Sequence, residues 1–159
     1  MPNWCAIIIT IWGNPESMTK YYNDLTNDTF SFEATIPVGE EDWYNNHITF
    51  WGTKWDISEP ETVKKTETEH VISGRTAWSP PEEWAENFSK KYKLNVKIAY
   101  VESGIGFYGI FEVGEGERVV KEFKFEIGDY TYDEETGQDI ISGKLEKFMD
   151  ENGLYDVGG

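Results

Sequence analysis

The chain has 159 residues, with 14 Lys or Arg against 30 Asp or Glu, so its formal net charge at pH 7 is −16. This charge argues against a nucleic-acid backbone or an anionic membrane surface as a direct ligand, because both are bound through basic faces. Aromatic side chains make up 16% of the residues. That content excludes a disordered chain and indicates a packed core. We assign residues 1–159 to a single domain.

Cysteine and histidine are too scarce to build common metal or disulfide sites. Cys5 is the only cysteine, which excludes an internal disulfide and a thiolate zinc site. The two histidines, His47 and His70, lack metal-binding spacing, and we expect them on ordinary strand surfaces. No segment has the pattern of a signal peptide or a membrane span. We therefore expect a cytoplasmic protein without a metal or a cofactor.

The first third of the chain opens with a strand and a helix. Residues 4–12 form a continuous apolar, β-branched run, which is typical of a strand buried on both faces. Asn14-Pro15 then begins a helix, because Asn caps helices and Pro suits the first helical position. Apolar and polar residues alternate over 30–36, which predicts a half-buried strand. We expect a short helix at 40–46 and a loop at 56–66.

The rest of the chain contains a strong helix and an antiparallel meander. Ser79 and Glu82 have the spacing of a capping box, and the helix that follows places Trp84, Phe88 and Tyr92 on one face. Strands are predicted at 69–77, 94–101, 107–113 and 118–127, with turns at 103–106 and 114–117. An acidic hairpin and a last short helix ended by Gly153 complete the chain.

Two local motifs are better explained by turns than by ligands. Gly104, Gly106 and Gly109 spell G-x-G-x-x-G, but this loop joins two strands, whereas a dinucleotide site requires it to open a helix. The carboxylates of 126–139 do not have the spacing of a calcium loop. We interpret the glycines as turn residues and the carboxylates as an exposed hairpin.

The segment 51–56 reads WGTKWD and has two interpretations. Trp51 and Trp55 could stack on the ring of a bound nucleotide, with Lys54 supplying a positive charge. Alternatively, both indoles close one edge of the core, since large aromatic side chains are most often packing groups.

Several separated segments together resemble a known family. They are MPNWC at the start, WGTKWD at 51–56, WSPP at 78–81 before a helix, and GFYG at 106–109. In order and spacing they are similar to the phage- and plasmid-borne YubB-type proteins with a ferredoxin-like domain, over residues 1–113. The resemblance implies an α+β fold with a split β-α-β antiparallel sheet and helices on one face. Residues 27–66 would be an insertion, and 114–159 a C-terminal strand, acidic hairpin and helix.

The resemblance implies an origin in a mobile element but supplies no activity. Since no catalytic constellation is visible, we expect a non-enzymatic accessory protein that binds and inhibits a host protein. Its carboxylates could take the place of phosphates in the basic cleft of a nucleic-acid-binding defence complex, such as a CRISPR effector. The charge could equally serve solubility alone. The alternative function is binding of a nucleotide or other small molecule by 51–56.

The acidic hairpin is the predicted contact with a basic host protein. Tyrosines two residues apart share one strand face, and rings beside carboxylates combine anchoring with electrostatic steering. The predicted contact residues are Asp129, Tyr130, Tyr132, Asp133, Glu134 and Glu135.

Overall fold

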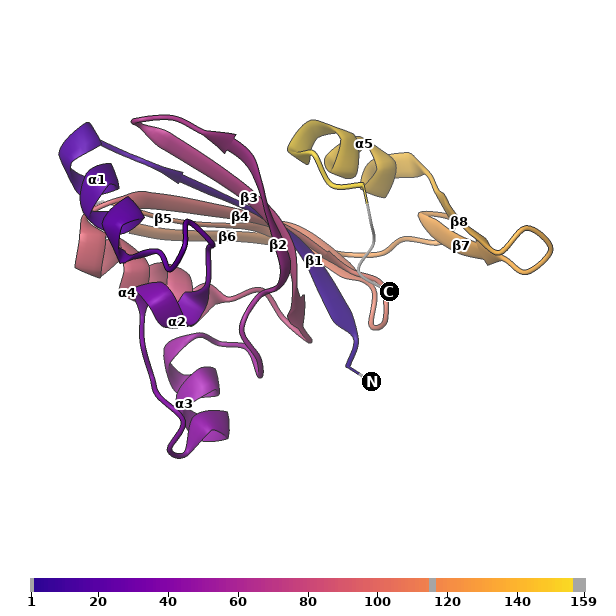
Figure 1. Ribbon diagram of the computed structural model, residues 1–159. Helices are drawn as coiled ribbons and strands as arrows, with labels where there is room; N and C mark the ends of the chain where they lie inside the picture. The colour runs from indigo at the N-terminus through magenta and orange to yellow at the C-terminus, as the bar shows by residue number, and fades with distance from the viewer. Residues whose placement is uncertain (1, 115–116, 156–159) are drawn as a thin grey trace.

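The computed structural model describes residues 2–114 and 117–155, and its centre is a six-stranded antiparallel sheet (Figure 1). The strand order is β2-β3-β1-β4-β5-β6. These strands are β1 (Trp4–Trp12), β2 (Ser58–Lys65), β3 (Glu69–Ala77), β4 (Asn95–Glu102), β5 (Phe107–Gly114) and β6 (Glu117–Lys124). The helices are α1 (Pro15–Asp24), α2 (Phe32–Thr35), α3 (Trp43–Phe50), α4 (Glu82–Tyr92) and α5 (Gly143–Asn152). A separate hairpin pairs β7 (Tyr130–Asp133) with β8 (Gln138–Ile141).

The order of the first four strands is that of a ferredoxin-like fold. All neighbouring strands are antiparallel, so β1 and β2 run parallel with β3 between them. In the same way, β3 and β4 run parallel with β1 between them, and α4 makes the crossover. The expected split β-α-β arrangement in an α+β fold is thereby confirmed. Strands β5 and β6 extend the sheet as the meander that the sequence predicts.

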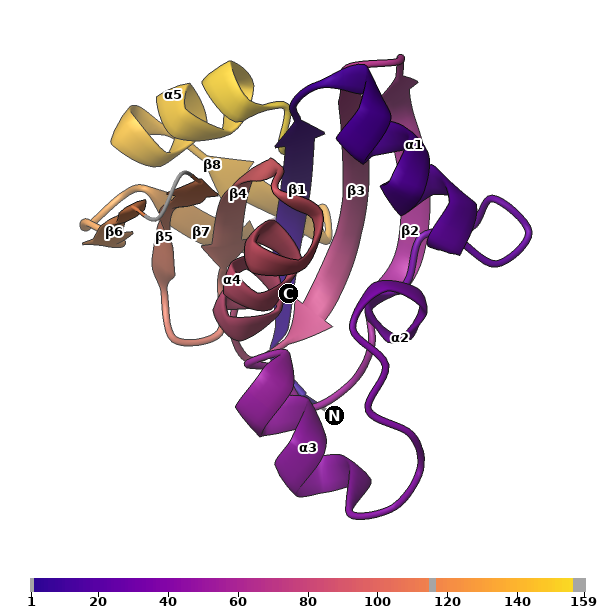
Figure 2. The same ribbon diagram turned by 90° about the vertical axis from the view of Figure 1, so that its left-hand side faces the viewer.

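The central strand β1 is packed on both faces of the sheet. Its residues Cys5, Ile7, Ile9 and Ile11 lie in the core beneath α1 and α4. Ala6 belongs to a second apolar cluster on the opposite face, where α5 packs. Figure 2 shows the two layers, with α4 and α1 in front of the sheet and α5 apart from them. None of the described helices is long and apolar enough to cross a membrane.

Two of the sequence predictions between residues 27 and 66 are wrong. The alternating segment 30–36 contains the short helix α2, because Ser31 Oγ accepts from Ala34 N and the Asp56 carboxylate accepts from Phe32 N and Glu33 N. The expected loop at 56–66 contains the edge strand β2, and its polar, exposed sequence conceals the pairing with β3. The helix expected at 40–46 begins and ends later in the sequence than expected, as α3.

Two further predictions need correction near α4 and β3. Ser79 does not cap α4, because the helix begins only at Glu82 and the Ser79 hydroxyl donates to Gly52 O at 2.8 Å. His70 is not a surface residue, since its side chain is 1% exposed. The predicted face of α4, with its large aromatic side chains, is buried as expected. The turn predicted at 114–117 includes residues 115 and 116, which lie outside the described residues.

Candidate functional site: an exposed aromatic surface bordered by carboxylates

The two indoles of the segment 51–56 lie in different environments. Trp51 is 1% exposed, its Nε1 donates to Ile36 O at 2.9 Å, and its ring stacks on His47 with centroids 4.1 Å apart. Trp55 is half-exposed and packs against Trp4, with ring centroids 6.0 Å apart. Trp51 is therefore a core residue and is not available to stack on a ligand.

A group of large apolar side chains around α3 remains in contact with solvent. No residue of α3 itself is buried. We call this group the aromatic surface, and its members, between 36% and 52% exposed, are Trp43, Tyr44, Ile48, Phe50, Trp55 and Trp78. Single exposed apolar residues are common, whereas contiguous exposed apolar patches are typical of interaction sites. Within this group, Trp43 lies against Tyr44, with ring centroids 5.9 Å apart.

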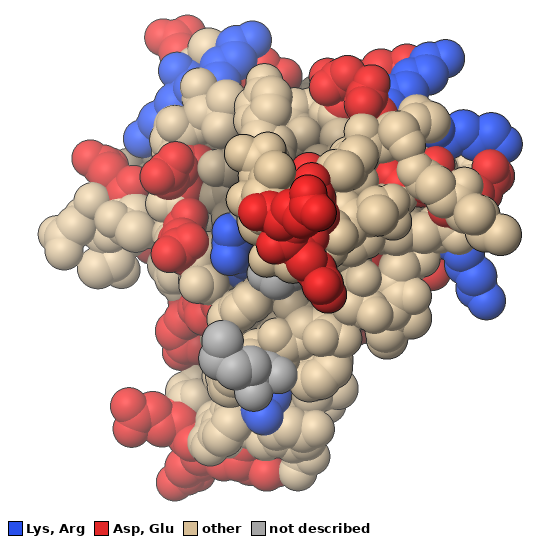
Figure 3. Space-filling view, turned by 90° about the vertical axis from the view of Figure 1, so that its right-hand side faces the viewer, with Lys and Arg blue, Asp and Glu red and all other residues tan. Residues whose placement is uncertain are grey.

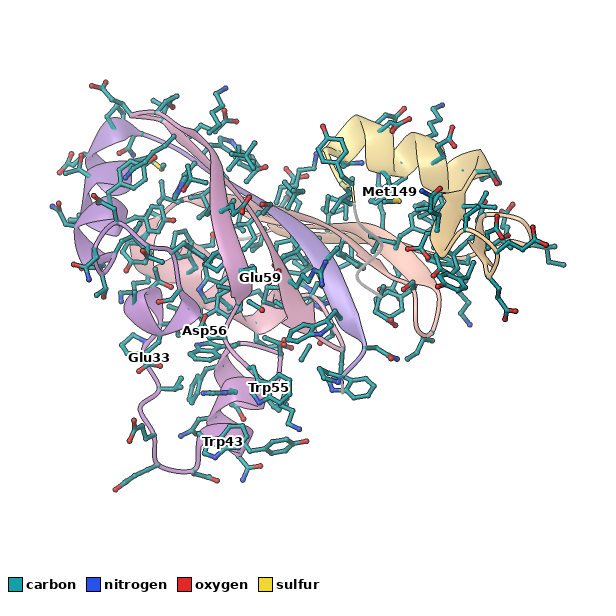
Figure 4. The ribbon with its side chains drawn as sticks, turned by 45° about the vertical axis from the view of Figure 1, so that its right-hand side comes forward. Glu33, Trp43, Trp55, Asp56, Glu59 and Met149 are labelled. Atoms are coloured by element: carbon teal, nitrogen blue, oxygen red, sulfur yellow. The ribbon has the colours of Figure 1, made fainter. Side chains whose placement is uncertain are left out.

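A chain of contacts connects the aromatic surface across two segments. The Trp43 ring lies 5.4 Å from His47, and His47 Nδ1 is hydrogen-bonded to Lys54 O at 2.7 Å. Lys54 Nζ lies 4.9 Å from the centroid of the Trp55 ring. Figure 4 shows Trp43 and Trp55 at the end of the molecule from which α3 projects. The loop 51–56 thus connects the exposed rings of α3 with Trp4 at the start of β1, against which Trp55 packs.

Trp78 is held in a backbone conformation that is rare for a bulky residue. Its φ is +72°, in the left-handed region, where side chains with a Cβ are disfavoured. The Trp78 N–H donates to Asn3 O at 2.8 Å, which fixes the residue beside the start of β1. Strain of this kind is concentrated at functional sites, and here it holds a ring that is 46% exposed.

Carboxylates border the aromatic surface. Glu40, Glu41 and Asp42 are exposed in the loop that leads into α3, whereas Glu59, also exposed, lies on β2 and lines a pocket with Ala6 and Tyr155. The side chain of Asp42 accepts from Asn45 Nδ2 at 2.9 Å. Acidic side chains gather at this lower end of the molecule and again near the centre of the view in Figure 3. The aromatic surface therefore combines apolar rings with a negative border.

The predicted contact residues on the hairpin are only partly available. Asp129 is 4% exposed, and its Oδ2 accepts from Glu126 N at 2.7 Å, so its carboxylate belongs to the fold and not to a contact surface. The Tyr130 hydroxyl donates to Asp139 Oδ1 at 2.8 Å, and burial together with Asp139 raises the pKa of Tyr130 to about 12. Tyr132 is 55% exposed.

The acidic tip of the hairpin is open to solvent. Glu134 and Glu135 are exposed, and Asp133 is half-buried. Asp133 Oδ1 accepts from Glu135 N at 2.9 Å, which fixes the turn. The carboxylates near the centre of Figure 3 lie at the end of the molecule that carries this hairpin.

Groups with catalytic potential are few among the described residues. The Cys5 thiol is fully buried, and burial raises its pKa well above the ordinary value. Within residues 2–114 and 117–155, no three His, Cys, Asp or Glu side chains are grouped so that they could hold a metal ion. A cleft of about 700 Å³ lies beside α4, but its Arg118 is already paired with Glu82 and Glu86 at 2.8 Å.

Comparison with known proteins identifies the family. Residues 50–156 match the family described as the ferredoxin-like domain in Api92-like protein. The chain belongs to this family. The match includes the hairpin β7–β8 and α5 of this Api92-like domain, whereas the resemblance seen in the sequence ended at residue 113. No curated protein matches the chain.

One solved structure is similar to this Api92-like domain. It is the crystal structure of Api92 from Yersinia pseudotuberculosis, with 14% sequence identity and a TM-score of 0.47. The similar region covers 61% of this chain and 40% of that protein.

The sequence did not reveal the aromatic surface as a unit. Its residues come from α3, from the loop 51–56 and from the end of β3, which are separate segments of the sequence. The available signal was a high density of aromatic residues over 43–55 with no helical or strand period. Such a segment cannot bury all of its rings on one face, so some of them must remain exposed.

Proposed function

We propose that the protein is a non-enzymatic accessory protein, carried by a phage or other mobile element, that binds and inhibits a basic host protein in the host cytoplasm. The exposed aromatic surface with its acidic border is the observation that carries this proposal. Trp and Tyr are the side chains that most often dominate the energy of protein–protein interfaces. Exposed apolar patches rimmed by polar residues are typical of sites of protein–protein interaction.

The charge of the chain supports a partner with a basic surface. The net charge is −16, and carboxylates border the rings of the aromatic surface. Complementary charges steer encounter and select partners, while buried rings supply affinity. A host protein that binds nucleic acid has such a basic surface, so a defence complex of this kind, for example a CRISPR effector, is our favoured target.

The hairpin β7–β8 is a second contribution to the same function. Its tip carries the exposed Glu134 and Glu135 in a turn, with the half-buried Asp133 and the exposed Tyr132 at the end of β7 beside them. We assign to it the long-range attraction of a basic partner, because exposed charges change association rates more than they change affinity. Nucleotide binding is less well supported, since the burial of Trp51 removes one of the two rings that it needs.

Capture from host lysate by wild-type protein and matched variants tests this function. A variant with Trp43→Ser and Trp55→Ser should lose a partner that wild-type protein retains. Val63→Ser is the control, because Val63 is 64% exposed on β2, away from the aromatic surface. The captured protein should also lose nucleic-acid binding when the wild-type chain is added. Capture by the double variant at the wild-type level would contradict the proposal, as would the absence of any partner.

A further inference from the structure

The two edges of the six-stranded sheet differ in how they are protected against pairing. The edge strand β2 contains Pro60, and its register with β3 shifts between Ser58 and Glu61 and again between Thr62 and Lys64. Proline and irregular register are common devices that prevent an edge from pairing with another strand. At the other edge, β6 pairs with β5 without interruption from Glu117 to Lys124 and contains neither device. Its protection consists of charged side chains instead, and a partner strand with complementary charges can satisfy them.

The exposed strand β6 combines five charged residues with three large apolar ones. All eight of its residues are exposed. Val119, Val120 and Phe123 are 47%, 43% and 52% exposed. No strand within the described part of the chain pairs with the outer side of β6. Its backbone N–H and C=O groups on that side are therefore free to pair with a strand from another molecule.

The charge of β6 favours a second copy of this chain as that molecule. The strand carries three cations and two carboxylates, in the sequence ERVVKEFK, whereas the whole chain has a charge of −16. Two such acidic molecules repel one another over most of their surfaces. At strand β6 the two molecules can approach each other, because each strand offers cations to the carboxylates of the other.

The geometry points to a single register for this pairing. We propose that two copies join through their β6 strands in antiparallel orientation, with the two-fold axis at Val120. The side chains of two residues directly opposite each other in an antiparallel pair lie on the same face of the sheet. A two-fold axis perpendicular to the sheet must therefore lie between two identical residues, one from each copy. With the axis at Val120, Arg118 of each copy lies opposite Glu122 of the other, and Val120 lies opposite itself.

Neighbouring registers are less favourable. An axis at Lys121 places Lys121 opposite itself and Arg118 opposite Lys124, and like charges directly opposite each other are destabilising. An axis at Val119 brings residues 122–124 opposite 114–116 and leaves fewer residues of β6 paired. The axis at Val120 pairs the whole of residues 117–123 with the same residues of the second copy.

Two side chains needed for this register are already held in place. Arg118 is bound by Glu82 and Glu86 on α4, each at 2.8 Å. Glu122 Oε2 accepts from the Tyr100 hydroxyl at 2.8 Å. Both groups are thus fixed on the side of the sheet that α4 covers. Each side chain keeps these partners within its own copy, so Arg118 and Glu122 of the two copies favour this register through the attraction of opposite charges and not through a new direct ion pair.

A cysteine scan along β6 tests the register. Val120→Cys should form a disulfide-linked dimer under mild oxidation, because only the residue on the two-fold axis lies opposite itself. Val119→Cys is the matched control, which should remain mostly uncrosslinked. Cys5 cannot contribute, since it is 0% exposed. Equal crosslinking at the two positions, or crosslinking of Val119→Cys alone, would overturn the proposed register.

Sedimentation of the unmodified chain tests the dimer itself. Wild-type protein should show a concentration-dependent dimer, and Val120→Lys should raise its dissociation constant about tenfold by placing two lysines opposite each other. Val63→Lys on the protected edge β2 should leave the dimer unchanged. A wild-type chain that stays monomeric at its highest soluble concentration would overturn the proposal. These outcomes do not depend on the host partner, so they leave the proposed function untouched.

Discussion

The imidazole of His70 on β3 is hydrogen-bonded through Nδ1 to the hydroxyl of Tyr21 on α1 at 2.8 Å, across 49 residues of sequence. Its other nitrogen, Nε2, is hydrogen-bonded to Thr62 Oγ1 at 3.0 Å. This pair joins the first helix to the sheet inside the core, where both side chains are almost fully buried. Burial, with a smaller effect of Lys65, lowers the pKa of His70 from 6.5 to about 4.

The lowered pKa of His70 predicts a loss of stability in mild acid. As the pH falls below 6.5, His70 of the unfolded chain takes up a proton, while His70 of the folded chain stays neutral until about pH 4. The unfolded state then binds more protons, so the free energy of unfolding decreases over this window. We expect the melting temperature of wild-type protein to fall more steeply than that of His70→Asn. Parallel pH profiles of the two proteins would contradict this prediction.

The left-handed backbone of Trp78 predicts an unusual order of stabilities. Glycine tolerates a φ of +72° without a Cβ clash, whereas alanine retains the strain. Trp78→Gly should therefore be more stable than Trp78→Ala by about 1 kcal/mol, the reverse of the usual effect of glycine. Chemical denaturation of both variants measures the difference. If alanine is the more stable replacement, the backbone of Trp78 is not strained.

A matched comparison separates this surface role of Trp78 from a core role. Trp84 on α4 is 0% exposed and packs in the core, so Trp84→Ala should lower the free energy of unfolding by about 3–5 kcal/mol. Trp78→Gly should cost less than about 1 kcal/mol, because relief of strain offsets the lost packing of a half-exposed ring. It should nevertheless weaken capture of the host partner.

The elements that could be predicted from the sequence are those whose own side chains decide their structure. The strand around Ile7 and the helix around Phe88 have strong apolar patterns, because each packs against the core along most of its length. Strand β2 has no such pattern, because it is an exposed edge strand that contains Pro60. Only its pairing with β3 in the folded structure shows that it is a strand. Helix α2 depends on the carboxylate of Asp56, which lies 24 residues from Phe32 in sequence.

The candidate site was harder to predict for a related reason. The sequence singled out Trp51 and Trp55 as a pair, but solvent exposure separates them, and exposure is decided by which helix packs above each ring. Trp51 is covered because Phe32 of α2 and His47 of α3 contact its ring. Without knowledge of α2, the burial of Trp51 could not be derived.

The buried carboxylate of Asp129 predicts a local effect on the C-terminal part of the domain. Asp129 Oδ2 accepts from Glu126 N, and the carbonyl of Asp129 accepts from Ser142 N at 3.0 Å just before α5. Asp129→Ala leaves the Glu126 N–H without its partner, at a cost of about 1–3 kcal/mol. We expect faster hydrogen exchange at Leu145 and Met149 with little change in β1. Uniform destabilisation of the whole sheet would show that Asp129 does not act locally.

The acidic tip of the hairpin predicts an effect on association rate without an effect on stability. Asp133 ends β7, and Glu134 and Glu135 lie in the turn that follows. The carboxylate of Asp133 accepts a hydrogen bond from Glu135 N. Replacing the three carboxylates by Ser should leave the melting temperature nearly unchanged, since exposed polar substitutions have small effects. The same variant should associate more slowly with the captured host partner at low salt, because the steering charge is removed.

A charge-matched control decides whether the position of these carboxylates matters. Glu67, Glu112 and Asp150 are exposed and scattered over β2–β3, β5 and α5, and their replacement by Ser removes the same net charge. Stopped-flow measurements at low salt should show slower association for the hairpin variant than for this scattered variant. At high salt the difference should disappear, because screening shortens the range of the charges. Equal rates for the two variants would mean that net charge alone, and not the hairpin, attracts the partner.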